Sequence, residues 1–144
     1  MAEQTESSIE IDASPATIMD VIADLPAYPQ WSDGITQVTV LEEKDGRPLR
    51  ARFHLESGPI RDTYELVYSW DGDRSVTWQL TTGEMLTAMD GTYLLDSHGG
   101  STTVHYRLAV DVRIPMIGMI KRKAERIIVD TALKGLRRRV AEVG

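Results

Sequence analysis

Residues 61–80, RDTYELVYSWDGDRSVTWQL, decide the fold of this chain. Apolar and polar residues alternate across 64–70, as in a β-strand that has one buried and one solvated face. Residues 71–73, Asp-Gly-Asp, are typical of a tight turn, and the alternation resumes at 76–80. The stretch therefore predicts two neighbouring antiparallel strands whose shared apolar face is rich in aromatic side chains.

The same period of two extends outward on both sides of this hairpin. A weak alternation at 7–11 indicates a first strand, and each later gap contains the glycine or proline that short turns require. Because consecutive short links join neighbouring strands, we expect an antiparallel meander. The six later strands are predicted at 35–43, 49–57, 61–70, 75–81, 86–96 and 102–112.

Three helical segments are expected around these strands. Ser14 is a good N-cap and Pro15 suits the first helical position, so a short helix is predicted over 15–23, followed by a shorter helical turn at 27–31. Pro115 opens a long helix that runs nearly to the end of the chain. Its predicted sheet-facing stripe comprises Ile120, Ala124, Ile127, Ile128, Thr131, Gly135 and Leu136. The predicted solvent face comprises Lys121, Arg122, Glu125, Arg126, Lys134, Arg137 and Arg138.

Composition favours one globular domain spanning residues 1–144, since 42% of residues are hydrophobic and 26% are charged. There is no cysteine, which excludes disulfides and thiolate metal sites. The acidic N-terminus does not resemble a secretion signal, and no apolar run reaches the roughly 20 residues that span a bilayer. A cytoplasmic location is the resulting expectation.

Several stretches resemble one known superfamily. Tyr28-Pro29-Gln30-Trp31, residues 58–64 (GPIRDTY) and residues 121–136 (KRKAERIIVDTALKGL) are similar to START/polyketide cyclase/dehydrase-like (SRPBCC) proteins. The resemblance spans almost the whole chain. It implies an α+β helix-grip fold, in which two short helices and a long C-terminal helix lie across the concave face of a curved seven-stranded antiparallel sheet. It also implies a cavity for a lipid, quinone or polyketide-like molecule.

The residues themselves point to the same kind of site, because the apolar sheet face and the long helix cannot close tightly along their whole length. Pockets for small molecules are mostly apolar and aromatic, and phenol hydroxyls can orient a ligand without burying a charge. A well-packed core is the competing interpretation. The predicted ligand-binding residues are Trp31, Phe53, Leu55, Tyr64, Leu66, Tyr68, Trp78, Leu80, Met85, Met89, Tyr93, Tyr106, Ile120, Ala124 and Ile127.

No catalytic signature accompanies this lining. His54 and His105 alternate with apolar residues and are expected on the outer face, and His98 lies in a predicted turn. Neither metal-ligand spacing nor a nucleotide-binding loop occurs, so no metal or cofactor is expected. Nucleic-acid binding is not expected either, because the aromatic residues belong to the buried face.

Three functions are compatible with the sequence. The first is binding or transport of a hydrophobic small molecule without catalysis. The second is an aromatase/cyclase or dehydratase that acts on a polyketide-like substrate, which would need polar groups such as Arg52 and Glu65 inside the cavity. The third is a docking module, because residues 121–144 carry 8 − 3 = +5 charges whereas the preceding residues carry 8 − 19 = −11. Membrane contact through this basic helix belongs to the third function, and the chain is expected to be a monomer or a homodimer.

Overall fold

A computed structural model describes residues 4–57, 60–113 and 118–143 and shows a seven-stranded antiparallel sheet. The strand order is β1-β7-β6-β5-β4-β3-β2, so every strand from β2 to β7 pairs with its neighbour in the sequence and β1 closes one edge beside β7. The strands are β1 (Thr5–Ile11), β2 (Ile35–Lys44), β3 (Arg47–Ser57), β4 (Ile60–Asp71), β5 (Ser75–Thr82), β6 (Leu86–His98) and β7 (Ser101–Val112).

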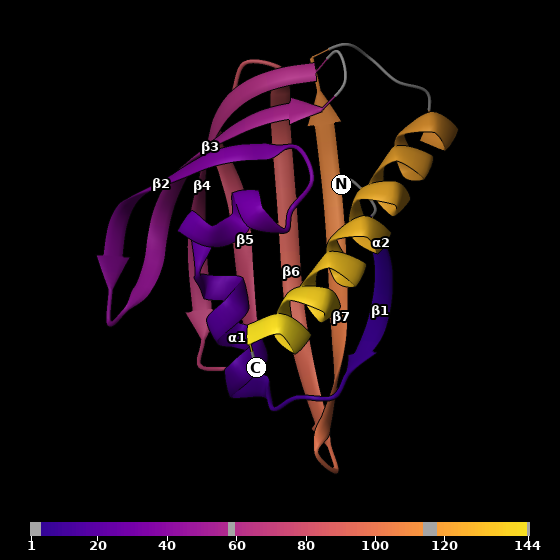
Figure 1. Ribbon diagram of the computed structural model, residues 1–144. Helices are drawn as coiled ribbons and strands as arrows, with labels where there is room; N and C mark the ends of the chain where they lie inside the picture. The colour runs from indigo at the N-terminus through magenta and orange to yellow at the C-terminus, as the bar shows by residue number, and fades with distance from the viewer. Residues whose placement is uncertain (1–3, 58–59, 114–117, 144) are drawn as a thin grey trace.

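Three helical elements lie on one side of this sheet, as Figure 1 shows. The α1 helix (Pro15–Ala23) begins after Ser14, whose hydroxyl accepts a hydrogen bond from the backbone N–H of Thr17, and a 3-10 helix, η1 (Leu25–Gln30), follows. The α2 helix (Gly118–Val143) runs diagonally across the sheet. No helix in the described ranges combines the length and the apolar content needed to cross a membrane.

The helices cover the sheet unevenly. The α2 helix packs against β1 and β7 at one edge, η1 packs against β2 near the other, and α1 contacts α2 and β6. Apolar and aromatic side chains that point inward from the central strands fill much of the region between these contacts. This arrangement is the predicted α+β helix-grip fold, which is thereby confirmed.

The elements agree closely with the sequence analysis. All seven strands are present, and α1 has the bounds that its N-cap and proline predict. The segment predicted at 27–31 is the 3-10 helix η1. Pro115, at which the long helix was predicted to begin, lies outside the described residues.

The predicted sheet-facing stripe of α2 is wrong at three positions, whereas Gly135 and Leu136 are buried as predicted. Ile127 and Ile128 are 58% and 45% exposed, and Thr131 is exposed as well. The side of α2 that packs on the sheet is rotated about the helix axis, relative to the predicted side, by about one residue position, or roughly 100°. Its buried residues are Glu125, Val129, Leu133, Gly135, Leu136 and Val140.

Glu125 explains the error. Its side chain is 2% exposed, where the sequence suggested a solvated charge. One carboxylate oxygen accepts a hydrogen bond from the Thr5 hydroxyl at 2.8 Å, and the other accepts one from the Val110 backbone N–H at 2.7 Å. A buried carboxylate requires such partners, since an unpaired charge would be costly to desolvate. Glu125 therefore fastens α2 to β1 and β7, and it makes an apolar helix face look polar in the sequence.

Candidate functional site

Aromatic side chains from five strands meet on the concave face of the sheet. Phe53 of β3 stacks on Tyr64 of β4 with ring centroids 5.3 Å apart. Further along the sheet, Trp78 of β5 lies 5.3 Å from Tyr93 of β6 and 5.7 Å from Tyr106 of β7. All five residues are buried. The register of the strands produces this cluster, because it places inward-pointing positions of neighbouring strands side by side.

Gly91 makes room for the largest of these rings. It pairs with Trp78 across β5 and β6, and a Cβ atom at Gly91 would lie only 2.1 Å from the indole ring. The absence of a side chain thus lets Trp78 lie flat against the neighbouring strand. This requirement is steric, and alternation alone does not reveal it.

The tyrosine hydroxyls converge on one interior region. Burial raises the pKa of Tyr64, Tyr68, Tyr93 and Tyr106, and electrostatic repulsion from one or more of the other phenols raises the pKa of the first three further. All four phenols therefore stay protonated at neutral pH. Among the described residues, none pairs with these hydroxyls, whereas the Tyr28 hydroxyl donates to the Ile22 carbonyl at 2.5 Å. Four neutral hydrogen-bond donors consequently face an apolar interior.

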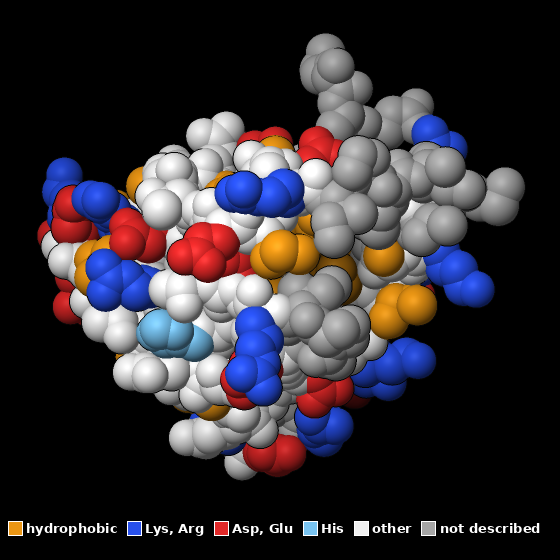
Figure 2. Space-filling model, turned by 90° about the horizontal axis from the view of Figure 1, so that it is seen from above, with side chains coloured by type: hydrophobic (Ala, Val, Ile, Leu, Met, Phe, Trp, Pro, Cys, Tyr) orange, Lys and Arg blue, Asp and Glu red, His pale blue; other side chains and the backbone are white. Residues whose placement is uncertain are grey.

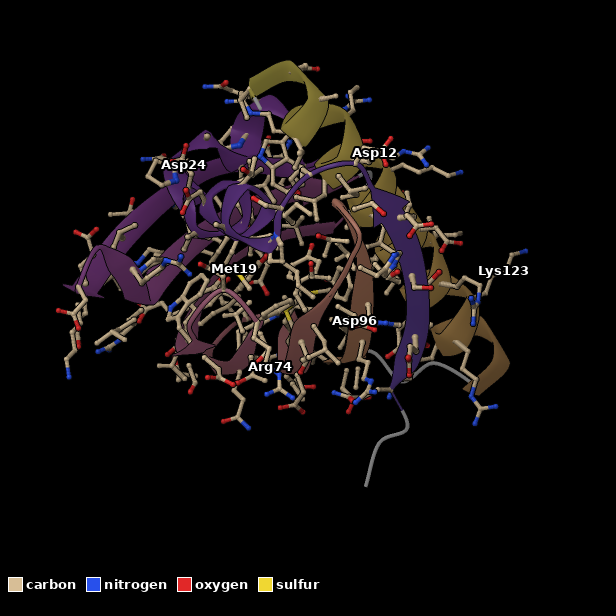
Figure 3. All side chains as sticks on the ribbon, turned by 90° about the horizontal axis from the view of Figure 1, so that it is seen from below. Asp12, Met19, Asp24, Arg74, Asp96 and Lys123 are labelled. Atoms are coloured by element: carbon tan, nitrogen blue, oxygen red, sulfur yellow. The ribbon has the colours of Figure 1, made fainter. Side chains whose placement is uncertain are left out.

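One end of this interior is closed by α1. Ile18, Met19 and Ile22 of this helix are at most 1% exposed. Figure 3 shows Met19 pointing into the space between the helices and the sheet. These close-packed side chains therefore block access to the interior from that end.

A polar network organises the opposite end of the sheet. Asp62 of β4 is buried, and its carboxylate accepts hydrogen bonds from the backbone N–H groups of Glu84, Met85 and Leu86 at 2.8 to 3.1 Å. Arg113, just after β7, donates from its side chain to the Glu84 carbonyl at 2.9 Å and from its backbone N–H to the Met85 carbonyl. We call these five residues the rim. The rim joins β4, the turn before β6 and the end of β7.

Two open pockets formed by described residues lie outside the interior, on either side of Trp31. One, of about 280 Å³, lies between α1 and the end of α2, and the other, of about 240 Å³, borders residues 29–36, Glu56 and Arg138. Trp31 itself is buried, and its indole N–H has no partner within the described ranges. A cavity between the concave face and α2 stays a prediction.

The predicted site residues fall into four groups. Those buried on the concave side are Phe53, Tyr64, Leu66, Trp78, Tyr93 and Tyr106, and Trp31 is buried beside α2. Those that are partly buried are Leu55, Tyr68, Leu80, Met85, Met89 and Ala124. The side chain of Ile120 lies outside the described part of the chain. Ile127 was assigned to the lining incorrectly, because it points to solvent on the outer side of α2.

Sequence reasoning missed three residues of this region. Tyr28 lies 4.8 Å from Trp31 and 6.3 Å from Phe53 between ring centroids, and it joins η1 to the aromatic cluster. Met19 and Asp62 were not singled out either. The Tyr28-Pro29-Gln30-Trp31 stretch, on which the family resemblance partly rests, contained a signal for Tyr28. Asp62 leaves no local pattern in the sequence, because its carboxylate caps three distant N–H groups.

The polar candidates lie on the other face of the sheet, as alternation predicts. Arg52 donates two hydrogen bonds to one oxygen of Glu65, at 3.1 and 3.3 Å. His54 contacts the hydroxyl of Thr63 on the same face. Within the described ranges, no three His, Asp or Glu side chains gather as a metal site would need. Charged groups that could act in acid–base chemistry are therefore not part of the aromatic cluster described above.

Comparisons with known proteins agree with this architecture. No curated protein sequence matches the chain. A START superfamily protein from Mycobacterium smegmatis superimposes with a TM-score of 0.91 at 24% identity, over 99% of both chains. The Zhui aromatase/cyclase from Streptomyces sp. R1128 superimposes with a TM-score of 0.77 at 15% identity, over 98% of this chain and 94% of that one. These likenesses show the fold.

The family follows from the sequence match. Residues 2–141 match the family described as polyketide cyclase / dehydrase and lipid transport. The matched range contains every strand, both α-helices apart from the last residues of α2, and the whole aromatic cluster. The chain belongs to the polyketide cyclase/dehydrase and lipid transport family.

Proposed function

We propose that the protein binds a hydrophobic small molecule between the concave face of its sheet and α2, without transforming it. The observation that carries this proposal is the set of four tyrosines, Tyr64, Tyr68, Tyr93 and Tyr106, whose hydroxyls have no hydrogen-bond partner among the described residues. Within the described ranges, the fully enclosed side-chain atoms without a partner are instead Trp31 Nε1 and Arg50 Nε, so the four phenol oxygens keep accessible surface from which they can donate to a ligand. A hydroxyl that donates to an acceptor on a ligand, in a site shielded from water, contributes about 1 kcal/mol to binding.

The chemistry of the lining defines the ligand class. Apolar rings and aliphatic side chains favour an apolar body, and burying such a surface contributes roughly 25 cal/mol per Å². Protonated phenols donate hydrogen bonds and carry no charge, so they suit neutral acceptors such as ketone or quinone oxygens. Among the described residues, no Lys, Arg or His side chain is buried with the five rings of the aromatic cluster, where it could pair with a carboxylate. We therefore infer an apolar, carbonyl-bearing guest rather than a free fatty acid.

Catalysis by the same side chains is the less favoured alternative. A cyclase needs acids and bases with pKa values near the working pH. Burial moves the pKa of the tyrosines in the opposite direction, which makes them poorer proton donors. The two carboxylates that are buried among the described residues, Asp62 and Glu125, are already bound to backbone N–H groups. Their positions indicate structural roles.

Ligand titration with tyrosine variants tests this proposal. A naphthoquinone should quench tryptophan fluorescence, since Trp78 lies within the cluster, and Tyr106→Phe should weaken the binding about fivefold by removing one hydrogen bond of ~1 kcal/mol. Tyr28→Phe is the matched control, because its hydroxyl is already bound to Ile22. That control should lose stability and retain affinity. Equal effects of both variants, or failure of quinones and aromatic polyketides alike to bind, would contradict the proposal.

A further inference from the structure

The α2 helix carries more apolar surface than the sheet covers. Val129, Leu133 and Leu136 are buried against the sheet side, yet Ile127 and Ile128 next to them are 58% and 45% exposed. Among the described residues, the large hydrophobic side chains that are exposed are these two isoleucines and Val143, and all three belong to α2. Exposed apolar side chains concentrated on one helix are a feature of interaction surfaces.

Basic residues lie on the same outer face of the helix. Lys123, Ile127, Thr131, Lys134 and Arg138 are spaced by three or four residues, so they form one line along α2. All five are exposed. We call these five residues the outer stripe. Figure 3 shows Lys123 extending away from the body of the protein.

Electrostatics gives this stripe a preferred partner. Residues 121–144 carry 8 − 3 = +5 charges, and the rest of the chain carries 8 − 19 = −11. Figure 2 shows hydrophobic side chains next to Lys and Arg side chains on the right of that view. An anionic surface would attract α2 and repel the sheet, and would thus bind the protein in one orientation.

We propose that the outer stripe, together with the neighbouring Ile128, docks on an anionic lipid surface with α2 parallel to the membrane plane. Helices of this kind insert apolar side chains at the level of the headgroups while Lys and Arg contact the lipid phosphates. A second copy of the chain fits less well, because two isoleucines fall far short of the ~800 Å² per partner that a stable dimer buries.

Docking in this orientation would also bring the rim close to the membrane. Lys121, in the first turns of α2, forms an ion pair of 2.6 Å with Asp111 near the end of β7, and Arg113 of the rim follows two residues later. The outer stripe therefore begins, at Lys123, two residues after the ion pair that joins α2 to the rim end of the sheet. This inference goes beyond the proposed function and does not depend on it.

Vesicle co-sedimentation tests the inference. The full chain should bind vesicles that contain phosphatidylglycerol and leave pure phosphatidylcholine vesicles unbound, and added salt should weaken the binding by screening. Lys123→Gln should reduce the affinity about fivefold, the equivalent of ~1 kcal/mol per cation near an anionic surface. Ile127→Ser should reduce it by a similar factor.

The controls are matched to these variants. Arg74→Gln removes one exposed positive charge in the turn after β4, and Val143→Ser removes an exposed apolar side chain that lies on the other side of α2 from the outer stripe, so both should bind as the wild type does. Far-UV circular dichroism checks that each variant is folded. The proposal is overturned if anionic vesicles do not bind at low salt, or if Arg74→Gln weakens binding as much as Lys123→Gln. It is also overturned if Ile127→Ser changes only a monomer–dimer equilibrium.

Discussion

Alkaline titration should unfold this protein abruptly, because every tyrosine of the chain has a raised pKa in the folded state. Burial raises the pKa of Tyr28, Tyr64, Tyr68, Tyr93 and Tyr106, whereas the same groups in the unfolded chain ionise near 10. Below pH 10 both states are protonated and stability is complete. Above pH 10 the unfolded state holds fewer protons than the folded state, so stability falls as pH rises.

The slope follows from the number of buried phenols. Each one lowers the free energy of unfolding by ~1.4 kcal/mol per pH unit while it ionises only in the unfolded state. Tyr64, Tyr93 and Tyr106 are 5%, 5% and 7% exposed, and these three alone give ~4 kcal/mol per pH unit. Including the half-buried Tyr28 and Tyr68 raises the slope to ~7 kcal/mol per pH unit. For a typical stability of 5 to 15 kcal/mol, the midpoint lies about one to three pH units above 10.

Two optical signals measured together test this prediction. Near-UV absorbance reports tyrosinate, far-UV circular dichroism reports secondary structure, and the two transitions should coincide. The steepness of the transition reports how many phenols ionise only on unfolding. Tyr106→Phe removes one of them, so it should reduce the steepness by one proton and serves as an internal control. If the phenols instead ionise one after another near pH 10 while the circular dichroism stays unchanged, the tyrosines are not buried as described and the reasoning fails.

Three further substitutions test the packing around the site by chemical denaturation. Glu125→Ala should cost about 2 to 4 kcal/mol because it leaves the Val110 N–H buried without an acceptor, and Glu125→Gln, which keeps an acceptor, should cost less. Gly91→Ala should cost about 1 to 3 kcal/mol of stability by overpacking against Trp78, and adding Trp78→Phe should recover part of the loss. If Gly91→Ala costs the same in the wild type and in the Trp78→Phe variant, the clash is ruled out. Asp62→Ala should destabilise by about 2 to 4 kcal/mol, since three N–H groups lose their acceptor, and an unchanged stability would show that water replaces the carboxylate.

Local patterns were sufficient to predict most of the fold. The alternation that starts at Tyr64 identifies the strands because one face of this sheet is buried and the other is solvated. Ser14 and Pro15 fix the start of α1 through hydrogen bonding and backbone geometry within one turn. Both signals depend only on neighbours in the sequence.

The site was predicted less completely because its decisive contacts join distant residues. Glu125 is buried through Thr5 and Val110, which are 120 and 15 residues away, and this displaced the predicted face of α2 by about one position. Asp62 likewise caps N–H groups more than twenty residues along the chain. Tyr64, Tyr93 and Tyr106 were identified as inward-facing residues, but the convergence of their hydroxyls depends on strand register.

The most direct test of a ligand site on the concave face is nuclear magnetic resonance of the protein labelled only at tyrosine. The chain has five tyrosines, so five ring signals can be assigned with single Tyr→Phe variants. On addition of a naphthoquinone, the signals of Tyr64, Tyr68, Tyr93 and Tyr106 should shift together in a saturable manner. Saturable binding that leaves all four signals unmoved would place the ligand elsewhere and contradict the account.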